Sequence, residues 1–171
     1  MEQIKRLIDT EKYLSEISNI IQSGKCVSVP VTGSSMEPFL KNGRDMVLLG
    51  RQREALDDIH CRIGDIILFR RTGGQYVLHR ICKISRQGCY VIGDAQTAAE
   101  GPLQNQQIVA KVMCIRRNGV WKDVGYWKWR LFGIFWVRVI PFRPRLRRVV
   151  QLCFGVNENC IKKFKRKGTR I

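Results

Sequence analysis

Two adjacent serines, Ser34 and Ser35, stand in the segment "VTGSSMEPFL", which spans residues 31–40. Pro38 follows Ser35 by three residues and would end any helix begun there, so a helix-capping role explains neither serine. A serine in such a segment either completes a turn or is presented as a nucleophile. Nucleophilic chemistry requires a base within hydrogen-bond reach of the hydroxyl, and usually a further group that orients the base.

Two histidines could supply this base. His60 lies in the polar stretch "ALDDIHCR", which indicates a loop, whereas His79 lies in the apolar run "YVLHRI", which predicts a strand. A lone histidine in a strand usually has a structural role, so its position alone does not make His79 catalytic. The surrounding sequence has to decide between the two interpretations.

The seven cysteines do not form a metal-binding pattern. Their number is odd, no Cys-x-x-Cys occurs, and no second pair at zinc spacing accompanies His60 and Cys61. We therefore expect free thiols in a reducing compartment, and neither a metal nor another cofactor.

The residues that could do chemistry must be positioned by a mainly β domain. Short apolar runs separated by Gly, Asn, Asp and Pro predict strands of an antiparallel sheet, and "RTGGQ" predicts a hairpin loop between two of them. The runs are "CVSVPV", "DMVLLG", "DIILFRR", "YVLHRICKI", "CYVIGD" and "IVAKVMCIRR".

A helix is predicted before this domain and a helical extension after it. Apolar residues spaced by three and four predict an amphipathic helix over residues 2–22, ending near Gly24. The C-terminal part contains all four tryptophans and many arginines, and Pro141 and Pro144 break any helix there. We expect three regions: the helix in residues 1–25, the β domain in 26–120 and the basic, aromatic extension in 121–171.

Four segments in order resemble the sequence boxes of the type I signal peptidases and, more distantly, those of the self-cleaving repressors of the same peptidase clan. "GSSMEPFLKNGRDMVLL" is similar to the nucleophile box and "IGDIILFRR" to the second box. "YVLHRICKI" is similar to the third, where bacterial members place a lysine base before an arginine, and "YVIGDAQTAAE" to the fourth, Gly-Asp-Asn followed by an acid. With "QIVAKVMCI" as the closing strand, the resemblance covers roughly residues 27–117 and implies a coiled antiparallel β domain of that type.

Carried over residue by residue, the resemblance implies that Ser35 is the nucleophile, because it directly precedes Met36, and that Ser34 is its neighbour. His79 takes the position of the base, directly before Arg80, as in the endoplasmic-reticulum and spore-former members. A histidine suits this role, since a pKa of ~6.5 leaves it mostly neutral at neutral pH.

The resemblance also implies how a substrate would bind. Gly33 would let the backbone approach a substrate strand, and Met36 and Pro38 would shape the turn and the pocket wall. The Ser35 N–H is a candidate oxyanion donor. In the family, the peptide pairs as an extended strand beside this segment, and small residues fit just before the cut.

Two acids compete for the third catalytic position. Histidine-type members place an aspartate six residues after the Gly-Asp aspartate, and Glu100 holds that position relative to Asp94. A glutamate can orient an imidazole, but its longer side chain requires a different approach. Asp94 is the alternative, although it could equally be a turn residue that stabilises "GDAQ".

Opposing effects act on the pKa of His79. Burial in the strand and the charge of Arg80 would lower this pKa, whereas a carboxylate partner such as Glu100 would raise it. We expect the carboxylate to prevail slightly, which puts the pKa at or just above its ordinary ~6.5.

The positive charge is concentrated in the extension. Residues 121–171 carry +12 of the net +17, and residues 1–120 carry +5, which favours an anionic partner for the extension. Aromatic and basic residues alternate there, as suits the headgroup layer of an anionic membrane; the alternative is a helix that covers a sheet edge with a solvated basic face. The residues are Tyr126, Trp127, Lys128, Trp129, Arg130, Phe132, Phe135, Trp136 and Arg138.

The chain departs from typical signal peptidases, which have an N-terminal transmembrane anchor. The longest uncharged apolar run of the extension is "LFGIFWV", whereas a span needs ~20 residues, and no secretory signal is present. We therefore expect a cytoplasmic location, peripheral on the inner face of the membrane.

The sequence predicts a serine endopeptidase of the signal peptidase type that cleaves a leader or precursor peptide after small residues by a Ser-His mechanism. The alternative is a catalytically inactive peptidase fold that binds a peptide, a membrane surface or nucleic acid. Nucleic acid is disfavoured, because no standard binding motif is present and residues 1–120 carry only +5.

Overall fold

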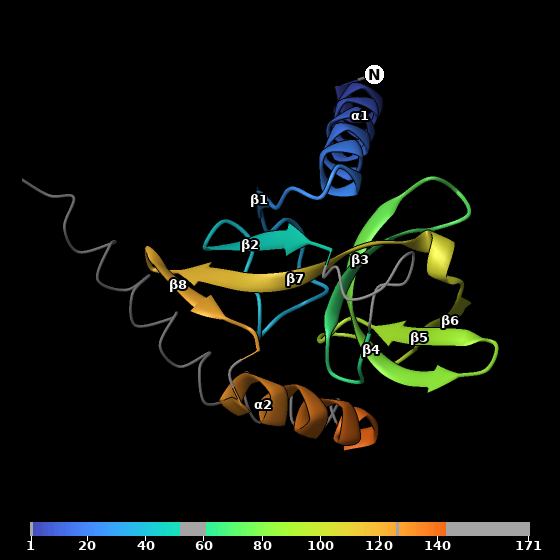
Figure 1. The fold of residues 1–171 in the computed structure, drawn as a ribbon, viewed down its shortest axis with the longest axis vertical. Helices are drawn as coiled ribbons and strands as arrows, with labels where there is room; N and C mark the ends of the chain where they lie inside the picture. Colours follow the sequence, from blue (N-terminus) through green and yellow to red (C-terminus); the bar gives the residue numbers. More distant parts are fainter. Residues whose placement is uncertain (1, 52–60, 126, 143–171) are drawn as a thin grey trace, which may run out of the picture. The chain divides into compact units, whose positions relative to one another are not determined.

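The structure is a computed structural model that describes residues 2–51, 61–125 and 127–142. Residues 1–138 form one compact unit, and residues 139–171 form a second, whose described part contains the short 3₁₀ helix η2 (Ile140–Phe142). In the described part of the first unit, a helix precedes eight strands and a second helix (Figure 1). The elements are α1 (Glu2–Gln22), β1 (Val27–Pro30), β2 (Asp45–Gly50), β3 (Ile66–Arg70), β4 (Tyr76–Ser85), β5 (Gly88–Ile92), β6 (Glu100–Leu103), η1 (Asn105–Gln107), β7 (Ile108–Arg117), β8 (Val120–Asp123) and α2 (Trp127–Arg138).

The predicted mainly β fold with a helix at each end is confirmed. The eight strands form one antiparallel sheet in the order β1-β2-β7-β3-β4-β5-β6, with β8 added to β7. All six apolar runs form strands, and the "RTGGQ" segment closes the β3–β4 hairpin, where the Arg71 N–H donates to the Gln75 carbonyl (2.8 Å).

Two short strands were not predicted. β6 contains Gly101 and Pro102, which are depleted in strands, and β8 is exposed along its whole length and lacks an apolar face. Both strands exist because a longer neighbour supplies the pairing: β5 pairs with β6, and β7 pairs with β8. Tertiary pairing rather than local sequence therefore determines these two elements.

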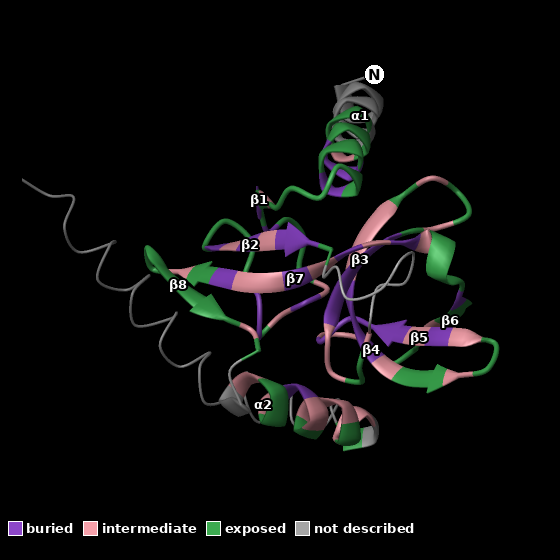
Figure 2. Cartoon of the chain, in the orientation of Figure 1, coloured by how far each residue is buried: buried purple, intermediate pink, exposed green. Residues whose placement is uncertain are grey.

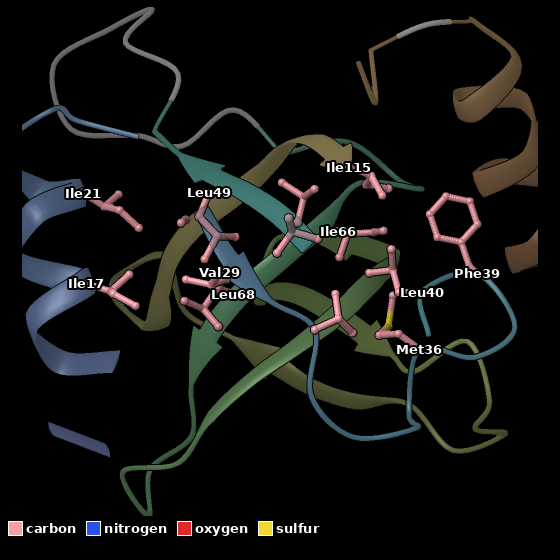
Figure 3. Close-up of a cluster of buried hydrophobic side chains, with 14 residues drawn as sticks. Ile17, Ile21, Val29, Met36, Phe39, Leu40, Leu49, Ile66, Leu68 and Ile115 are labelled. Carbon is pink, nitrogen blue, oxygen red and sulfur yellow. The ribbon is translucent and has the colours of Figure 1, made fainter. Parts of the chain in front are cut away.

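One hydrophobic cluster joins α1 to the sheet. β3, which lies between β7 and β4, is buried except at Arg70, as the purple ribbon in Figure 2 indicates. Figure 3 shows Ile17 and Ile21 of α1 at one end of the cluster and Phe39 at the other, and all three are buried. The apolar residues Ile17 and Ile21 of the last turns of α1 therefore serve to pack the helix on the core.

An aromatic cluster attaches α2 to the loop between β1 and β2. The ring of Phe39 lies 4.8 Å from Trp129 and 5.1 Å from Phe132, and Phe132 stacks on Trp136 at 5.6 Å between centroids. We call these four residues the Phe39 cluster. Gly133 lets α2 approach Arg80 closely, since a Cβ at this position would lie 2.9 Å from a guanidinium nitrogen of Arg80.

No helix in the described residues is long and apolar enough to cross a lipid bilayer. His60, Tyr126, Pro144 and the basic residues of 143–171 lie outside the described residues, as do the side chains of Trp127 and Lys128.

Candidate active site

Ser35 lies in the loop between β1 and β2, which backbone hydrogen bonds hold on either side of it. The Glu37 N–H donates to the Ser34 carbonyl (3.1 Å), and the Leu40 N–H donates to the Met36 carbonyl (2.8 Å). Ser34 is exposed, Ser35 is half-buried and Met36 is 3% exposed, because its side chain enters the hydrophobic cluster. The loop thus anchors itself through Met36 and presents Ser35 at the boundary between core and solvent.

Asp45, at the start of β2, fixes the end of this loop. Its buried carboxylate accepts the Lys41 N–H (3.0 Å) and pairs with the guanidiniums of Arg44 (2.7 Å) and Arg117 (3.1 Å). Arg117 also donates to the Phe39 carbonyl. These bonds hold the pKa of Asp45 well below its ordinary value, although burial alone would raise it.

The turn after β5 holds the main chain of Ser35 from the other side. The Ala95 N–H donates to the Ser35 carbonyl at 2.8 Å. A Cβ on Gly93 would lie 2.7 Å from the same carbonyl oxygen, so only glycine allows this close approach. The Ser35 loop and the "GDAQ" turn are therefore in direct contact, although about 60 residues separate them in sequence.

His79 lies in β4 with 1% of its surface exposed. Its Nδ1 atom lies 3.0 Å from Glu100 Oε1 of β6, a distance that gives an ion pair only when the ring is protonated, and the two atoms are not aligned as a hydrogen bond. On the same side of the sheet, the ring centroid lies 5.9 Å from that of Phe69. The fold thus brings together His79 and Glu100, two of the predicted residues.

Arg71, which the sequence analysis did not select, also binds Glu100, and it shares the Oε1 atom with His79. Its Nε donates to Oε2 (2.7 Å) and its Nη2 donates to Oε1 (2.6 Å). These hydrogen bonds hold the pKa of Glu100 below its ordinary value, so the carboxylate is ionised at neutral pH.

Asp94 has a different partner. Its two oxygens accept hydrogen bonds from Arg80 Nε (2.8 Å) and Nη2 (2.7 Å), and both side chains are about 1% exposed or less. Arg80 also donates to the Gly64 carbonyl (2.8 Å), and the Asp94 carbonyl accepts the indole N–H of Trp136 (3.2 Å). The structure therefore pairs Asp94 with the residue after His79 and Glu100 with His79 itself.

The expected pKa of His79 is wrong in direction. Burial lowers this pKa below its ordinary 6.5 and outweighs Glu100, which raises it; Arg71 lowers it further. The cation that lowers the pKa is Arg71 and not Arg80 as the sequence analysis expects, and Asp94, the partner of Arg80, raises this pKa. His79 is consequently neutral at neutral pH, as a general base must be.

An apolar pocket of about 330 Å³ adjoins Ser35. Met36 forms part of its wall, as do Leu78, the residue before His79, and Tyr13 and Leu14 of α1. The other lining residues are Val29, Pro30, Val31, Thr32, Val47, Leu49, Leu68, Tyr76 and Val77. The pocket could receive an apolar or small side chain next to the Ser35 hydroxyl.

The remaining predicted residues, Gly33, Ser34 and Pro38, do not line the pocket. Gly33 has φ +78°, which favours glycine, and a Cβ there would meet no atom within 4 Å, so the space for an approaching strand is open. Pro38 is exposed and, like Gly33, is not among the lining residues. Among the described residues, no hydrogen bond joins Ser35 Oγ to His79, and His79 does not line the pocket beside Ser35.

The described residues contain no group of three or more His, Cys, Asp or Glu side chains arranged to hold a metal ion. Comparisons with known protein families, curated proteins and solved structures find no match to this chain.

Proposed function

We propose that the protein is a serine endopeptidase of the signal peptidase type, with Ser35 as nucleophile, His79 as base and Glu100 as the acid that orients the base. The observation that carries this proposal is the 3.0 Å approach of His79 Nδ1 to Glu100 Oε1. With Nδ1 beside the carboxylate, Nε2 is the ring nitrogen left to accept the serine proton. The contact between the Ser35 carbonyl and the Ala95 N–H supports the same arrangement, because it ties the nucleophile loop to the turn beside Arg80.

In the proposed reaction, neutral His79 accepts the Ser35 proton while Oγ attacks the scissile carbonyl. The carbonyl oxygen becomes an oxyanion, for which the Ser35 N–H is suited because it makes no backbone hydrogen bond among the described residues. His79 then protonates the leaving amine, and a water molecule activated by the imidazole hydrolyses the acyl ester. Glu100 stabilises the imidazolium that forms in each half of the reaction.

The proposed substrate is an extended leader or precursor peptide with small residues before the cut. The apolar pocket beside Ser35 supports this, since it offers few polar partners to a side chain. β1 lies at the end of the sheet order, so a peptide strand can pair with its outer edge and pass Ser35. Pairing at a sheet edge binds the main chain of many sequences and leaves selectivity to the pocket.

We also propose that α2 contacts the inner face of an anionic membrane. Leu131 and Phe135 are one turn apart and are 57% and 59% exposed, while the Phe39 cluster occupies the opposite face of the helix. Arg130 and Arg138 are exposed beside them and complement acidic headgroups. Replacing Leu131 and Phe135 by serine should weaken binding to anionic vesicles; unchanged binding would reject this contact.

An inactive peptidase fold is the second candidate, favoured by the missing hydrogen bond between Ser35 and His79 in the described residues. Cleavage of a peptide with small residues before the scissile bond distinguishes the two. Ser35→Ala and His79→Ala should each abolish cleavage, and their losses should not add, because the residues act as a unit. Ser34→Ala is the matched control and should retain most activity. Equal cleavage by Ser35→Ala and the wild type would reject the assignment of Ser35.

A further inference from the structure

Arg71 connects the candidate site to the β3–β4 hairpin. Its planar fork binds both oxygens of Glu100 (2.7 and 2.6 Å), which fixes the orientation of the carboxylate as well as its position. One of these oxygens, Oε1, is also the atom 3.0 Å from His79 Nδ1. Glu100 is therefore held between a cation and the imidazole.

The hairpin in turn holds Arg71. The Arg71 N–H donates to the Gln75 carbonyl (2.8 Å), and the Gly74 N–H donates to the Arg71 carbonyl (2.9 Å). Gly74 has φ +90°, a conformation that glycine adopts at little cost and that lets this tight loop close. Arg71 Nη1 also reaches Gln75 Oε1 (3.2 Å). The side chain thus extends from a backbone fixed at both its N–H and its carbonyl.

A glutamate at this position needs such an anchor. Its side chain has one more torsion than aspartate, and ordering that torsion costs conformational entropy. The Glu100 side chain is 28% exposed, so packing alone does not restrict it to one rotamer. The next residues, Gly101 and Pro102, offer little side-chain surface beside it.

We propose that Arg71 is a positioning residue that holds Glu100 against His79, which extends the proposed Ser-His-Glu group to four members. This inference rests on the proposed function. The charged groups that act on the imidazole are Glu100 from β6, Arg71 from the hairpin and Asp94 from the turn after β5, the last of which also pairs with Arg80. Arg71 is the group among them that contacts the acid directly.

The first test does not depend on activity. The chain has two histidines, so a His60→Gln background leaves His79 as the single imidazole for NMR titration of the full-length protein. In that background, Glu100→Gln should lower the pKa of His79, because the carboxylate that raises this pKa is lost. In an Arg71→Gln chain the same Glu100→Gln change should lower it much less, since Glu100 is no longer held at the ring. Arg70→Gln is the matched control and should leave the full effect of Glu100→Gln, because Arg70 contacts Gly74 and Tyr76 instead.

The second test uses peptide cleavage and a double-mutant cycle. Arg71→Gln should lower kcat about tenfold or more at the plateau of the pH profile, because misplacing the acid misplaces the base. The same change in a Glu100→Gln background should have little further effect, since Arg71 acts through Glu100. Arg70→Gln should cleave like the wild type.

Two results would overturn the inference: a Glu100→Gln shift of the imidazole pKa that is equally large with and without Arg71, or equal losses of kcat on Arg71→Gln with and without the Glu100 carboxylate. Absence of cleavage by the wild type would reject the proposed function instead, and the titration would still report whether Arg71 acts on His79. Because Arg71 is 39% exposed, its substitution should leave the fold intact, which circular dichroism can verify.

Discussion

Two arginine–carboxylate pairs with nearly the same geometry occupy very different surroundings. Arg80 and Asp94 meet at 2.7 Å with both side chains fully buried, and Arg71 and Glu100 meet at 2.6 Å with 39% and 28% of their side chains exposed. Each arginine uses two nitrogens on two oxygens. The pairs differ in solvent access and in which of them reaches His79.

The difference in burial indicates that the Arg80–Asp94 pair stabilises the fold, whereas the Arg71–Glu100 pair can serve another role. Neither buried partner can lose the other without leaving an uncompensated charge in the core, so Arg80 and Asp94 must stay together while the protein is folded. Water screens the exposed pair, so Arg71 and Glu100 contribute little to stability. Their arrangement can instead orient the Glu100 carboxylate toward the His79 imidazole. Asp94 therefore fits a structural role, and Glu100 fits the proposed catalytic one.

The largest expected effect is on stability. Asp94→Asn should lower the free energy of unfolding by about 3–5 kcal/mol, because it leaves the charge of Arg80 buried without its partner. Urea unfolding at neutral pH measures the change. Glu100→Gln, which breaks the exposed pair, is the matched control and should cost no more than about 1 kcal/mol. Equal losses for the two variants would show that burial does not separate the pairs.

The loss of activity should be larger for Glu100→Gln than for Asp94→Asn, the reverse of their order in stability. Glu100→Gln should lower kcat about a hundredfold or more, because a neutral amide cannot stabilise the imidazolium that forms at His79. Asp94→Asn, assayed well below its melting temperature, should lose far less. The check is kcat for both variants on one peptide substrate. A greater loss of kcat in the folded Asp94→Asn variant would transfer the catalytic role to Asp94.

The sequence was sufficient for the elements that carry their own pattern. Apolar runs predicted the strand of His79 and both strands around the Ser35 loop, because burial of alternating or continuous apolar residues determines them locally. The partner of Glu100 could not be found this way. Arg71 reaches it only because β6, a four-residue strand with Gly101 and Pro102, pairs with β5 and sets Glu100 opposite Val91.

The aromatic residues of the extension show the same limit. A uniform alternation with basic residues suggested one membrane-facing surface, yet Trp129, Phe132 and Trp136 pack in the Phe39 cluster, while Phe135 is exposed. Composition gives the residues suited to an interface but not the helix face on which each one lies. Contacts with Phe39, about 90 residues earlier, decide that.

The pH dependence of cleavage sharpens the comparison further. His79 must be neutral to act, and its pKa lies below the ordinary 6.5, so kcat/KM should rise with pH, reach half its plateau below pH 6.5 and then level off. Glu100→Gln should move the midpoint lower still, because the carboxylate that raises this pKa is gone. A wild-type profile still climbing above pH ~8.5 would mean that the base is not an imidazole.

The lowered pKa of His79 should also make the free energy of unfolding depend on pH. An unfolded chain binds a proton at the ordinary imidazole pKa, and the folded chain binds it only at lower pH. Between the two pKa values the unfolded state holds more protons, so stability should fall as the pH falls from about 6.5 through the folded pKa. Replacing His79 by glutamine should flatten this part of the urea-unfolding profile, whereas an unchanged slope would assign it to other groups.

The smallest expected effect, on the free energy of unfolding, tests whether Trp136 of α2 helps to hold Asp94 in the buried pair. Trp136 donates its indole N–H to the Asp94 carbonyl at 3.2 Å, and its ring stacks on Phe132. Trp136→Phe keeps an aromatic ring but removes the donor, so the free energy of unfolding should fall by about 1 kcal/mol, the typical worth of one hydrogen bond. Phe135→Ala is the control on the exposed face of the same helix and should change stability by less. In an Asp94→Asn background, the loss of stability on Trp136→Phe should differ from that in the wild type if α2 and the ion pair stabilise each other. If the two losses simply add, α2 packs on the turn without stabilising the Arg80–Asp94 pair.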